Sequence, residues 1–327
     1  MHPTNELSKS VVILDIFESL NQGDSVNKQQ LADKYNRDPK TIQRYIREIK
    51  DYYYYLYPDK EVTVEYNHSE EGHQLTEDSH YCLTNKELLA ICKIILDRRA
   101  FNKAELNQLT EKLLNLTSTD EKSSVKDMIL NEKFHYTTLQ HEKPLLDIIW
   151  DLNKAIREQK LLEIEYERGG HKKVSRSLKP LGLIFSEYYF YLIAEFKDQT
   201  DDYKIPYRLD RIIDYTIIDE HFKVPYTDRF EEGQFKKRIQ FMIPGQLAKI
   251  KFKYWGPSVE FVLDRLPTAT ILAEEDDGYI IEAEIFGRGI EQWILSQGSS
   301  MEVLEPAKIR DSIEKTAREI LGIYKGG

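Results

Sequence analysis

The chain has 327 residues, a formal net charge of −10, an apolar fraction of 41% and a charged fraction of 31%. This length suggests two or three domains of roughly 100–150 residues, and no apolar run approaches the roughly 20 residues that span a membrane. The N-terminus lacks the apolar core of a signal peptide, so we expect a cytoplasmic protein without a membrane partner. The negative charge disfavours non-specific nucleic-acid binding, so any contact with DNA must be local.

Three short helices are predicted near the N-terminus. Apolar residues recur at helical spacing over 11–20, Asn27 can cap a second helix over Lys28–Tyr35, and a third helix runs from Pro39 to about Tyr52. Asp38 as N-cap with Pro39 at the first helical position is a strong start signal. The third helix buries one stripe, made of Ile42, Tyr45, Ile46 and Ile49.

The third helix also carries a basic face. Residues 37–50 hold five basic side chains (37, 40, 44, 47, 50) and two acidic ones (38, 48), a local balance of +3. A strand over 62–66, a polar turn over 67–72 and a return over 73–75 complete a predicted winged helix-turn-helix. The alternative is a merely solvated face. The predicted DNA contacts are Arg37, Lys40, Thr41, Gln43, Arg44 and Arg47. One such domain selects sites weakly, so we expect a homodimer on two half-sites.

A helical connector follows. Thr84 and Glu87 form a capping-box pattern, apolar faces predict helices after Thr84 and over 105–116, and 117–124 is a predicted polar break. The connector suits dimerisation or the relay of motion. Cys82 and Cys92 lack zinc or disulfide spacing, so we interpret both as reduced, structural residues.

The central part reads as a helix and several short strands. The predicted elements are a helix over 145–158, a strand over 161–166, a turn at Gly169-Gly170, a hairpin over 185–196 and a strand over 205–215. Together they predict a small, strongly bent barrel. Residues 168–179 form the most basic stretch of the chain, with five basic residues, His171 and no acid.

Three motifs here resemble the signature of the WYL domain. They are Arg176-x-x-x-Pro180, the triplet Phe190-Tyr191-Leu192 and the run RLDRI over 208–212. Phe190 stands where the family usually has Trp. The resemblance extends over nearly the whole chain, because a winged helix-turn-helix before a WYL domain is the usual layout of bacterial regulators. It implies an SH3-like (Sm-like) β-barrel that binds a nucleotide-bearing ligand, or single-stranded nucleic acid in some members, and thereby controls DNA binding.

Arginine and lysine beside aromatic rings suit a phosphate joined to a base. The predicted ligand-binding residues are Arg176, Lys179, Tyr191, Arg208 and Arg211. The alternative for Arg208 and Asp210 is a structural ion pair, because strand alternation places both on one face. Phe190 and Tyr191 alternate on the strand, so we expect at least one of them in the core.

The C-terminal part follows a polar linker over 234–238. Predicted elements in the order βαββαβ(α) indicate a ferredoxin-like α/β sandwich. Trp293-Ile294-Leu295, Gly298 and residues 303–306 resemble the extension that usually follows WYL domains. We expect this part to support oligomerisation and to close over the neighbouring ligand site.

The fold class predicted is therefore multidomain α+β, with boundaries at 1–80 (winged helix-turn-helix), 81–143 (connector), 144–225 (WYL) and 236–327 (ferredoxin-like). The predicted function is ligand-responsive transcriptional regulation, with double-stranded operator DNA and a nucleotide or single-stranded nucleic-acid effector as partners. The alternative is an accessory factor that binds RNA or single strands without promoter specificity. We expect no enzyme, no cofactor and no metal, because no catalytic constellation or phosphate-cradling glycine loop stands out.

Overall fold

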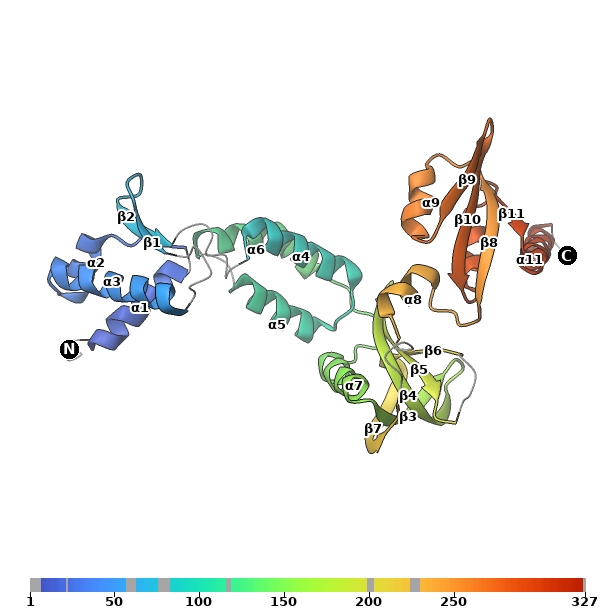
Figure 1. The fold of residues 1–327 in the computed structure, drawn as a ribbon, viewed down its shortest axis with the longest axis horizontal. Coiled ribbons are helices and arrows are strands. Elements are labelled where there is room, and N and C mark those ends of the chain that lie inside the picture. Colours follow the sequence, from blue (N-terminus) through green and yellow to red (C-terminus); the bar gives the residue numbers. More distant parts are fainter. Residues whose placement is uncertain are drawn as a thin grey trace. The chain divides into compact units, whose positions relative to one another are not determined.

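The computed structural model describes residues 7–21, 23–56, 63–75, 83–115, 119–198, 203–223 and 230–325. The chain divides into two compact units, Met1–Glu142 and Lys143–Gly327, which are described separately here. Both mix helices with antiparallel sheet (Figure 1).

The first unit begins with three helices and a hairpin. These are α1 (Lys9–Asn21), α2 (Lys28–Tyr35), α3 (Pro39–Leu56), β1 (Val64–Asn67) and β2 (Gly72–Leu75). The predicted caps are confirmed: Asn27 Oδ1 accepts from the backbone N–H of Gln29, and Asp38 Oδ1 accepts from that of Lys40. The predicted stripe of α3 is buried.

Helix α3 continues four residues beyond the predicted end. Tyr53 is buried in the core, its ring stacks on Phe17 with centroids 5.7 Å apart, and its hydroxyl donates to Asn21 Oδ1 at 2.9 Å. This contact extends the buried stripe by one turn, which holds the following residues in the helix.

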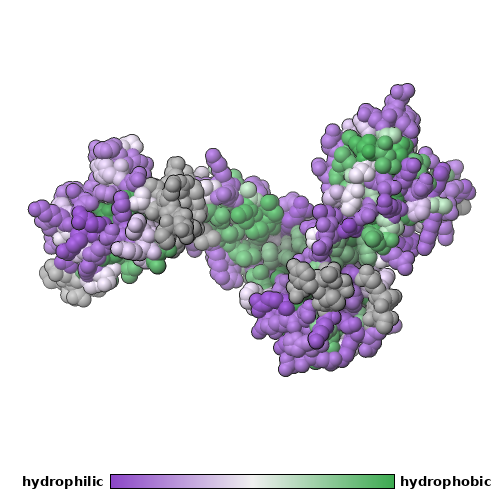
Figure 2. All heavy atoms as spheres, viewed as in Figure 1, coloured by the Kyte–Doolittle hydropathy of each residue, from purple (hydrophilic) through white to green (hydrophobic). Residues whose placement is uncertain are grey.

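Three connector helices complete the first unit, namely α4 (Asn85–Arg98), α5 (Lys103–Leu114) and α6 (Thr119–Phe134). The capping box of Thr84 and Glu87 is confirmed. The predicted polar break over 117–124 is wrong from Thr119 onward, because Val125 and Ile129 of α6 pack into the connector core. Ile94 on α4 is 62% exposed, and Figure 2 shows apolar surface over this helix.

The two cysteines differ in what the structure says of them. Cys92 is a fully buried free thiol in the connector core, and burial raises its pKa. A buried thiol with a raised pKa is a poor nucleophile. Cys82 lies outside the described residues, so its prediction stays a prediction.

The second unit opens with helix α7 (Leu146–Glu158), which packs on a five-stranded antiparallel sheet of order β6-β5-β4-β3-β7. Its elements are β3 (Lys160–Arg168), β4 (Lys172–Ser186), β5 (Tyr189–Phe196), β6 (Ile205–Arg208), the 3₁₀ turn η1 (Leu209–Arg211) and β7 (Ile212–His221).

The sheet is strongly curled. Its two edge strands, β6 and β7, are joined only by the three residues of η1. Four strand spacings would separate the edges of a flat sheet by roughly 19 Å, whereas the linking backbone reaches about 13 Å when fully extended. The sheet must therefore bend so that its edges approach each other at η1.

The predicted single strand over 205–215 is wrong in one respect. The turn η1 interrupts it, because Leu209 is drawn into the core beneath α7 while Asp210 is buried beside it. Arg208 therefore ends one edge strand, and Ile212 begins the other.

The C-terminal part contains a second antiparallel sheet of order β11-β8-β10-β9. Its core includes Phe252 and Trp293, and helices α9, α10 and α11 contribute to it. The elements are α8 (Glu232–Arg238), β8 (Leu247–Tyr254), α9 (Val259–Arg265), β9 (Thr270–Glu275), β10 (Gly278–Phe286), α10 (Gly289–Ser296), β11 (Met301–Glu305) and α11 (Ala307–Tyr324). Figure 2 shows apolar surface on the β9 and β10 side of this sheet.

The predicted polar linker over 234–238 is wrong, because these residues belong to helix α8. Phe235 is buried in a cluster with Ile184, Ile193, Ile239, Met242 and Phe286, and this cluster joins the two sheets of the second unit. Among the described helices, none combines the length and the apolar character needed to cross a membrane.

Candidate nucleic-acid interface and effector site

The exposed face of α3 is a compact cationic surface. At 100° per residue, Lys40, Gln43, Arg44, Arg47 and Lys50 fall within an arc of about 120°, opposite the buried stripe. All four of these cations are exposed. Among the described residues, no carboxylate pairs with any of them. We refer to these five residues as the α3 arc.

Helix α3 carries two acids, Glu48 and Asp51, and Asp51 is exposed and falls within the arc one turn after Arg47. Glu48 Oε1 lies 2.8 Å from Lys9 Nζ, so this carboxylate is engaged by α1. Of the other predicted contacts, Arg37 is half-buried and donates from Nη2 to the Leu7 carbonyl at 2.9 Å. Thr41 is half-buried and lies outside the α3 arc, about 60° beyond Arg44. The arc therefore unites Lys40, Gln43, Arg44 and Arg47, while Arg37 anchors the preceding segment.

The hairpin beside α3 has the opposite charge. Residues 64–75 contain Glu65, Glu70 and Glu71, which are all exposed, and no lysine or arginine. This acidic composition is visible in the sequence, and the prediction of a winged helix-turn-helix did not take it into account. A phosphate backbone would be repelled by these carboxylates.

The second candidate site is built around Arg208. Its Nε and Nη2 donate to the two carboxylate oxygens of Asp210 at 3.0 and 2.7 Å, a bidentate pair. Its guanidinium carbon lies 3.4 Å from the centroid of the Tyr189 ring. The side chain of Arg208 is 21% exposed and that of Asp210 is 5% exposed. Arg208 and Asp210 thus form the ion pair that was the alternative to ligand binding. This pair leaves Nη1 of Arg208 without an acceptor among the described residues.

Strand register explains this arrangement. Arg208 on β6 stands opposite Tyr191 on β5, and Tyr189 lies two residues before Tyr191 on the same face. The Tyr189 and Tyr191 rings meet edge to face at 6.4 Å. Tyr191 packs against the cluster around Ile239 and Met242, whereas Phe190 packs into the core beneath α7. Both aromatic residues of the triplet are therefore partly buried, on opposite faces.

Burial and charge tune the groups around Arg208. Burial acts to lower the pKa of Arg208, but its hydrogen bonds with Asp210 outweigh this and raise the pKa overall. Burial raises the pKa of Tyr207 to about 12 and also raises the pKa values of Tyr166 and Tyr191. The site therefore presents a permanent cation among neutral phenols.

The remaining predicted ligand residues are distributed around the sheet. Arg176 stands opposite Ile164, on the face covered by α7, with its guanidinium carbon 5.7 Å from the Phe196 centroid. Lys179 stands opposite Glu195, on the Tyr191 face but four residues away along β5, roughly 13 Å. Arg211 lies in η1, close enough for its charge to act on Tyr166. The structure groups Arg208 with Tyr191 and separates Arg176 from them.

Two neighbours of Arg208 were not among the predicted site residues. Tyr189 stacks on the guanidinium, and the hydroxyl of Tyr166 accepts a hydrogen bond from the backbone N–H of Arg208 at 3.2 Å. The two-residue spacing between Tyr189 and Tyr191 is a signal that identifies the first; nothing local identifies the second. Within the described ranges, no group of three or more His, Cys, Asp or Glu residues is arranged to hold a metal.

Comparison with known proteins adds two domain assignments. A family model described as WYL domain matches residues 147–217, and another described as WCX domain matches residues 246–321. The chain carries a WYL domain and a WCX domain. The Arg208 site lies within the WYL domain, and α9, α10 and most of α11 belong to the WCX domain.

Solved structures with similarity to this chain share little sequence with it. Proteasome accessory factor B/C (PafBC) of Arthrobacter aurescens is 14% identical, with 94% of this chain and 47% of that chain covered and a TM-score of 0.30. A CRISPR Cas-related protein is 16% identical, with 76% of each chain covered and a TM-score of 0.37. The chain thus spans about half the length of PafBC. No curated protein sequence matches the chain.

Proposed function

We propose that this chain is a DNA-binding transcriptional regulator that reads an operator with the α3 arc and senses a nucleotide or single-stranded nucleic acid through its WYL domain. The assignment of operator binding rests on the α3 arc. A chain with a net charge of −10 keeps four exposed cations on one helix face, without carboxylate partners among the described residues. Such a face supplies the local phosphate contacts that the overall charge opposes.

The surrounding elements support this proposal. Helices α1–α3 followed by the hairpin β1–β2 have the order of a winged helix-turn-helix, and the turn between α2 and α3 contains a left-handed residue, Asn36, with φ 49°. In the C-terminal sheet the fourth, first, third and second strands lie in that order, which supports a ferredoxin-like sandwich. The proposal includes a cytoplasmic homodimer on paired half-sites and no catalytic role.

The effector half of the proposal rests on the donors that Arg208 keeps. A guanidinium has five N–H donors, and Asp210 engages two of them. The donors of Nη1 suit a phosphate oxygen, and the neighbouring Tyr191 ring suits a base. Because η1 joins both edges of the sheet, a ligand at Arg208 would favour one sheet curvature over another, which shifts a population of states.

A band-shift titration tests the DNA assignment. Duplexes that bind the full-length protein are first selected from a randomised library, and the preferred sequence is then titrated at physiological salt. The variant Arg44→Glu/Arg47→Glu is expected to weaken binding at least about a hundredfold, because two phosphate or base contacts become repulsive. The matched control Lys112→Glu/Lys126→Glu changes the net charge equally on exposed connector positions and is expected to bind like the parent.

Equal loss in both variants would show that net charge alone acts, and unchanged binding by the arc variant would refute the assignment to α3. Competition with single-stranded DNA and RNA of the same sequence separates operator binding from an accessory role on single strands. A preference for single strands would refute duplex reading.

A further inference from the structure

A cleft in the second unit, here called the α8–α9 cleft, is lined by residues other than Arg208, Tyr189 and Tyr191. It has a volume of about 320 Å³ and is formed by the β4–β5 turn, helix α8, the segment after α8 and the end of α9. Its cationic lining consists of Lys236, Lys237 and Arg265, and Asp264 and Glu187 supply carboxylates. This volume is at the lower end of the range for small-ligand sites, which begins at roughly 300 Å³.

Arg265, like Arg208, contacts a carboxylate and an aromatic ring, but through a single hydrogen bond and at a longer distance from the ring. Its Nη2 donates to Glu187 Oε1 at 3.2 Å, and its guanidinium carbon lies 5.3 Å from the centroid of the Phe241 ring. The remaining donors of Arg265 have no acceptor among the described residues, and its Nε is buried in that state. A carboxylate and a ring thus fix an arginine whose Nη1 group is left for a ligand.

Two lysines add positive charge to the cleft. Lys236 and Lys237 are exposed in the last turn of α8, and neither has a carboxylate partner in the part of the chain that the structure describes. Glu187 is engaged by Arg265, so the cleft presents its lysines to an anion with Asp264 as the remaining carboxylate. A helix C-terminus favours cations, which accounts for their position but not for the cleft beside them.

Part of the cleft lining has an unusual backbone. Phe241 and Met242 both adopt left-handed conformations, with φ of 51° and 50°, which cost energy for residues with side chains. The surroundings enforce this path: Ile239 bridges to Phe286, and a Cβ on Gly289 would lie 1.7 Å from the Gln240 carbonyl oxygen. The result is an exposed aromatic ring, Phe241, directed toward Arg265 at the cleft.

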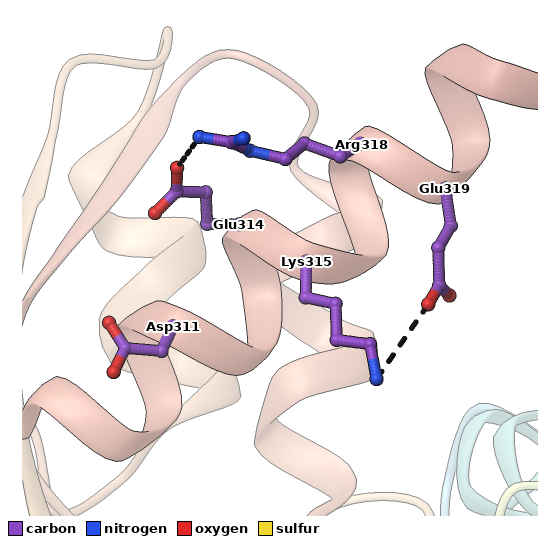
Figure 3. Close-up of a pocket in the computed structure, with 5 residues that line it drawn as sticks. All are labelled: Asp311, Glu314, Lys315, Arg318 and Glu319. Atoms are coloured by element: carbon purple, nitrogen blue, oxygen red, sulfur yellow. Dashed lines mark hydrogen bonds and ion pairs between the residues drawn. The ribbon is translucent and has the colours of Figure 1, made fainter.

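A second surface hollow, along α11, serves as a comparison, because its cations are paired with carboxylates. Along α11, Arg318 pairs with Glu314 and Lys315 lies 3.9 Å from Glu319, so both cations are matched by carboxylates one turn away (Figure 3). Such pairs within one exposed helix are ordinary surface features. The α8–α9 cleft differs because Lys236 and Lys237 have no such partner among the described residues.

We infer that the α8–α9 cleft binds a nucleoside 5′-monophosphate, or the terminal nucleotide of a short strand, independently of the Arg208 site. The phosphate is contacted by Lys236, Lys237 and Nη1 of Arg265. The base packs on the Phe241 ring, and the Asp264 carboxylate accepts a hydrogen bond from a sugar hydroxyl. Charge-assisted contacts and stacking are the two interactions that nucleotide sites combine. Because Ile239 and Met242 line the cleft and belong to the cluster against which Tyr191 packs, occupancy here reaches the strand that carries the WYL triplet.

Calorimetric titration of the full-length protein with AMP, GMP, CMP and UMP, in the absence of DNA, tests this inference. At least one is expected to bind with a dissociation constant below about 1 mM, tighter than inorganic phosphate or the parent nucleoside. The variants Lys236→Ala/Lys237→Ala and Arg265→Ala are each expected to weaken this binding about tenfold or more. Lys236 and Lys237 are exposed, so their replacement leaves the core intact.

Two further proteins make the result specific. Lys154→Ala/Lys172→Ala removes the same charge from exposed positions outside the cleft and is expected to retain binding. Arg208→Ala removes the arginine of the WYL site, so the binding that remains in this variant is the binding assigned to the cleft. No saturable binding of any of the four nucleotides overturns the inference, and so does equal binding by the parent and the cleft variants. Loss in Arg208→Ala alone assigns the nucleotide to the WYL site and likewise overturns it. Operator binding is not measured, so failure here is distinct from failure of the operator-binding half of the proposed function.

Discussion

The guanidinium carbon of Arg208 lies 3.4 Å from the centroid of the Tyr189 ring, while Asp210 holds the edge of the same group. The ring on its face fixes the plane of the guanidinium, and the two hydrogen bonds to Asp210 fix its orientation within that plane. Substitutions at either partner therefore test both stability and ligand binding.

Replacement of Asp210 by alanine is expected to destabilise the WYL domain by roughly 1–3 kcal/mol, because it leaves a mostly buried guanidinium without its carboxylate. Urea unfolding followed by tyrosine fluorescence measures this change. The control is Glu302→Ala, which breaks an ion pair with Arg310 whose side chains are 46% and 53% exposed. Its effect is expected within about 0.5 kcal/mol. Equal losses in the two variants would contradict a special role for the Arg208 pair.

The salt dependence of operator binding is expected to fall when one arc residue is neutralised. With Arg47→Gln, the slope of log affinity against log salt concentration should become less steep by about 1, because one phosphate contact releases no counterion. Titrations at several salt concentrations measure the slope. An unchanged slope with reduced affinity would instead assign Arg47 to a base edge.

The acidic hairpin predicts a gain of affinity. Neutralising it with Glu70→Gln/Glu71→Gln is expected to tighten operator binding about two- to fivefold at low salt, since two charges that repel phosphate disappear. The gain should vanish in high salt, where the Debye length is short. Weaker binding in this variant would show that the carboxylates contribute favourable contacts.

The stability of the fold is expected to decrease at alkaline pH because of Tyr207. Burial raises its folded pKa to about 12, above the value near 10 of an unfolded tyrosine, so the fold favours the neutral phenol. The associated stability, on the order of 2 kcal/mol, is fully present below about pH 10 and is lost as pH rises toward 12. Unfolding midpoints across this window are expected to fall less in Tyr207→Phe than in the parent. Tyr324 is 86% exposed, so Tyr324→Phe should follow the parent.

Replacement of two glycines by alanine is expected to change the stability of the protein in opposite directions. At Gly289 the new Cβ would lie 1.7 Å from the Gln240 carbonyl oxygen, a backbone clash, so a loss of about 3 kcal/mol or more is expected. At Gly322 no atom lies within 4 Å of the new Cβ, and the site is inside helix α11. There alanine should raise stability by roughly 0.5–1 kcal/mol. Thermal unfolding of both variants checks the pair.

Local signals predicted much of the fold. Caps such as Asn27, Asp38 and Thr84 locate helix starts because they act on backbone groups a few residues away. The errors occur where a distant contact overrides local polarity. The residues of α8 were predicted to be a linker, but the packing of Phe235 against Phe286 stabilises a helix there. The first residues of α6 were predicted to be a break, but Val125 and Ile129 pack into the connector core and stabilise that helix.

The candidate sites divide in the same way. Periodicity alone identified the basic face of α3, and the spacing of Arg208 and Asp210 indicated their ion pair only as the alternative to ligand binding. The turn η1 was missed because its cause is the burial of Leu209 beneath α7, a contact across the fold. The α8–α9 cleft could not be predicted, since its lining comes from segments near 187, 237, 241 and 265 that only the folded chain brings together.

The short turn between β6 and β7 has a consequence for solubility. Unpaired strand edges recruit other chains, and proteins guard against this by closing their sheets or by disrupting their borders. The WYL sheet brings its two borders together at residues 209–211, which leaves little open edge there for a foreign strand. In the C-terminal sheet, β9 is a border strand whose six residues are all exposed, including Ile271 and Leu272. Under stress, aggregation of this protein should begin at β9.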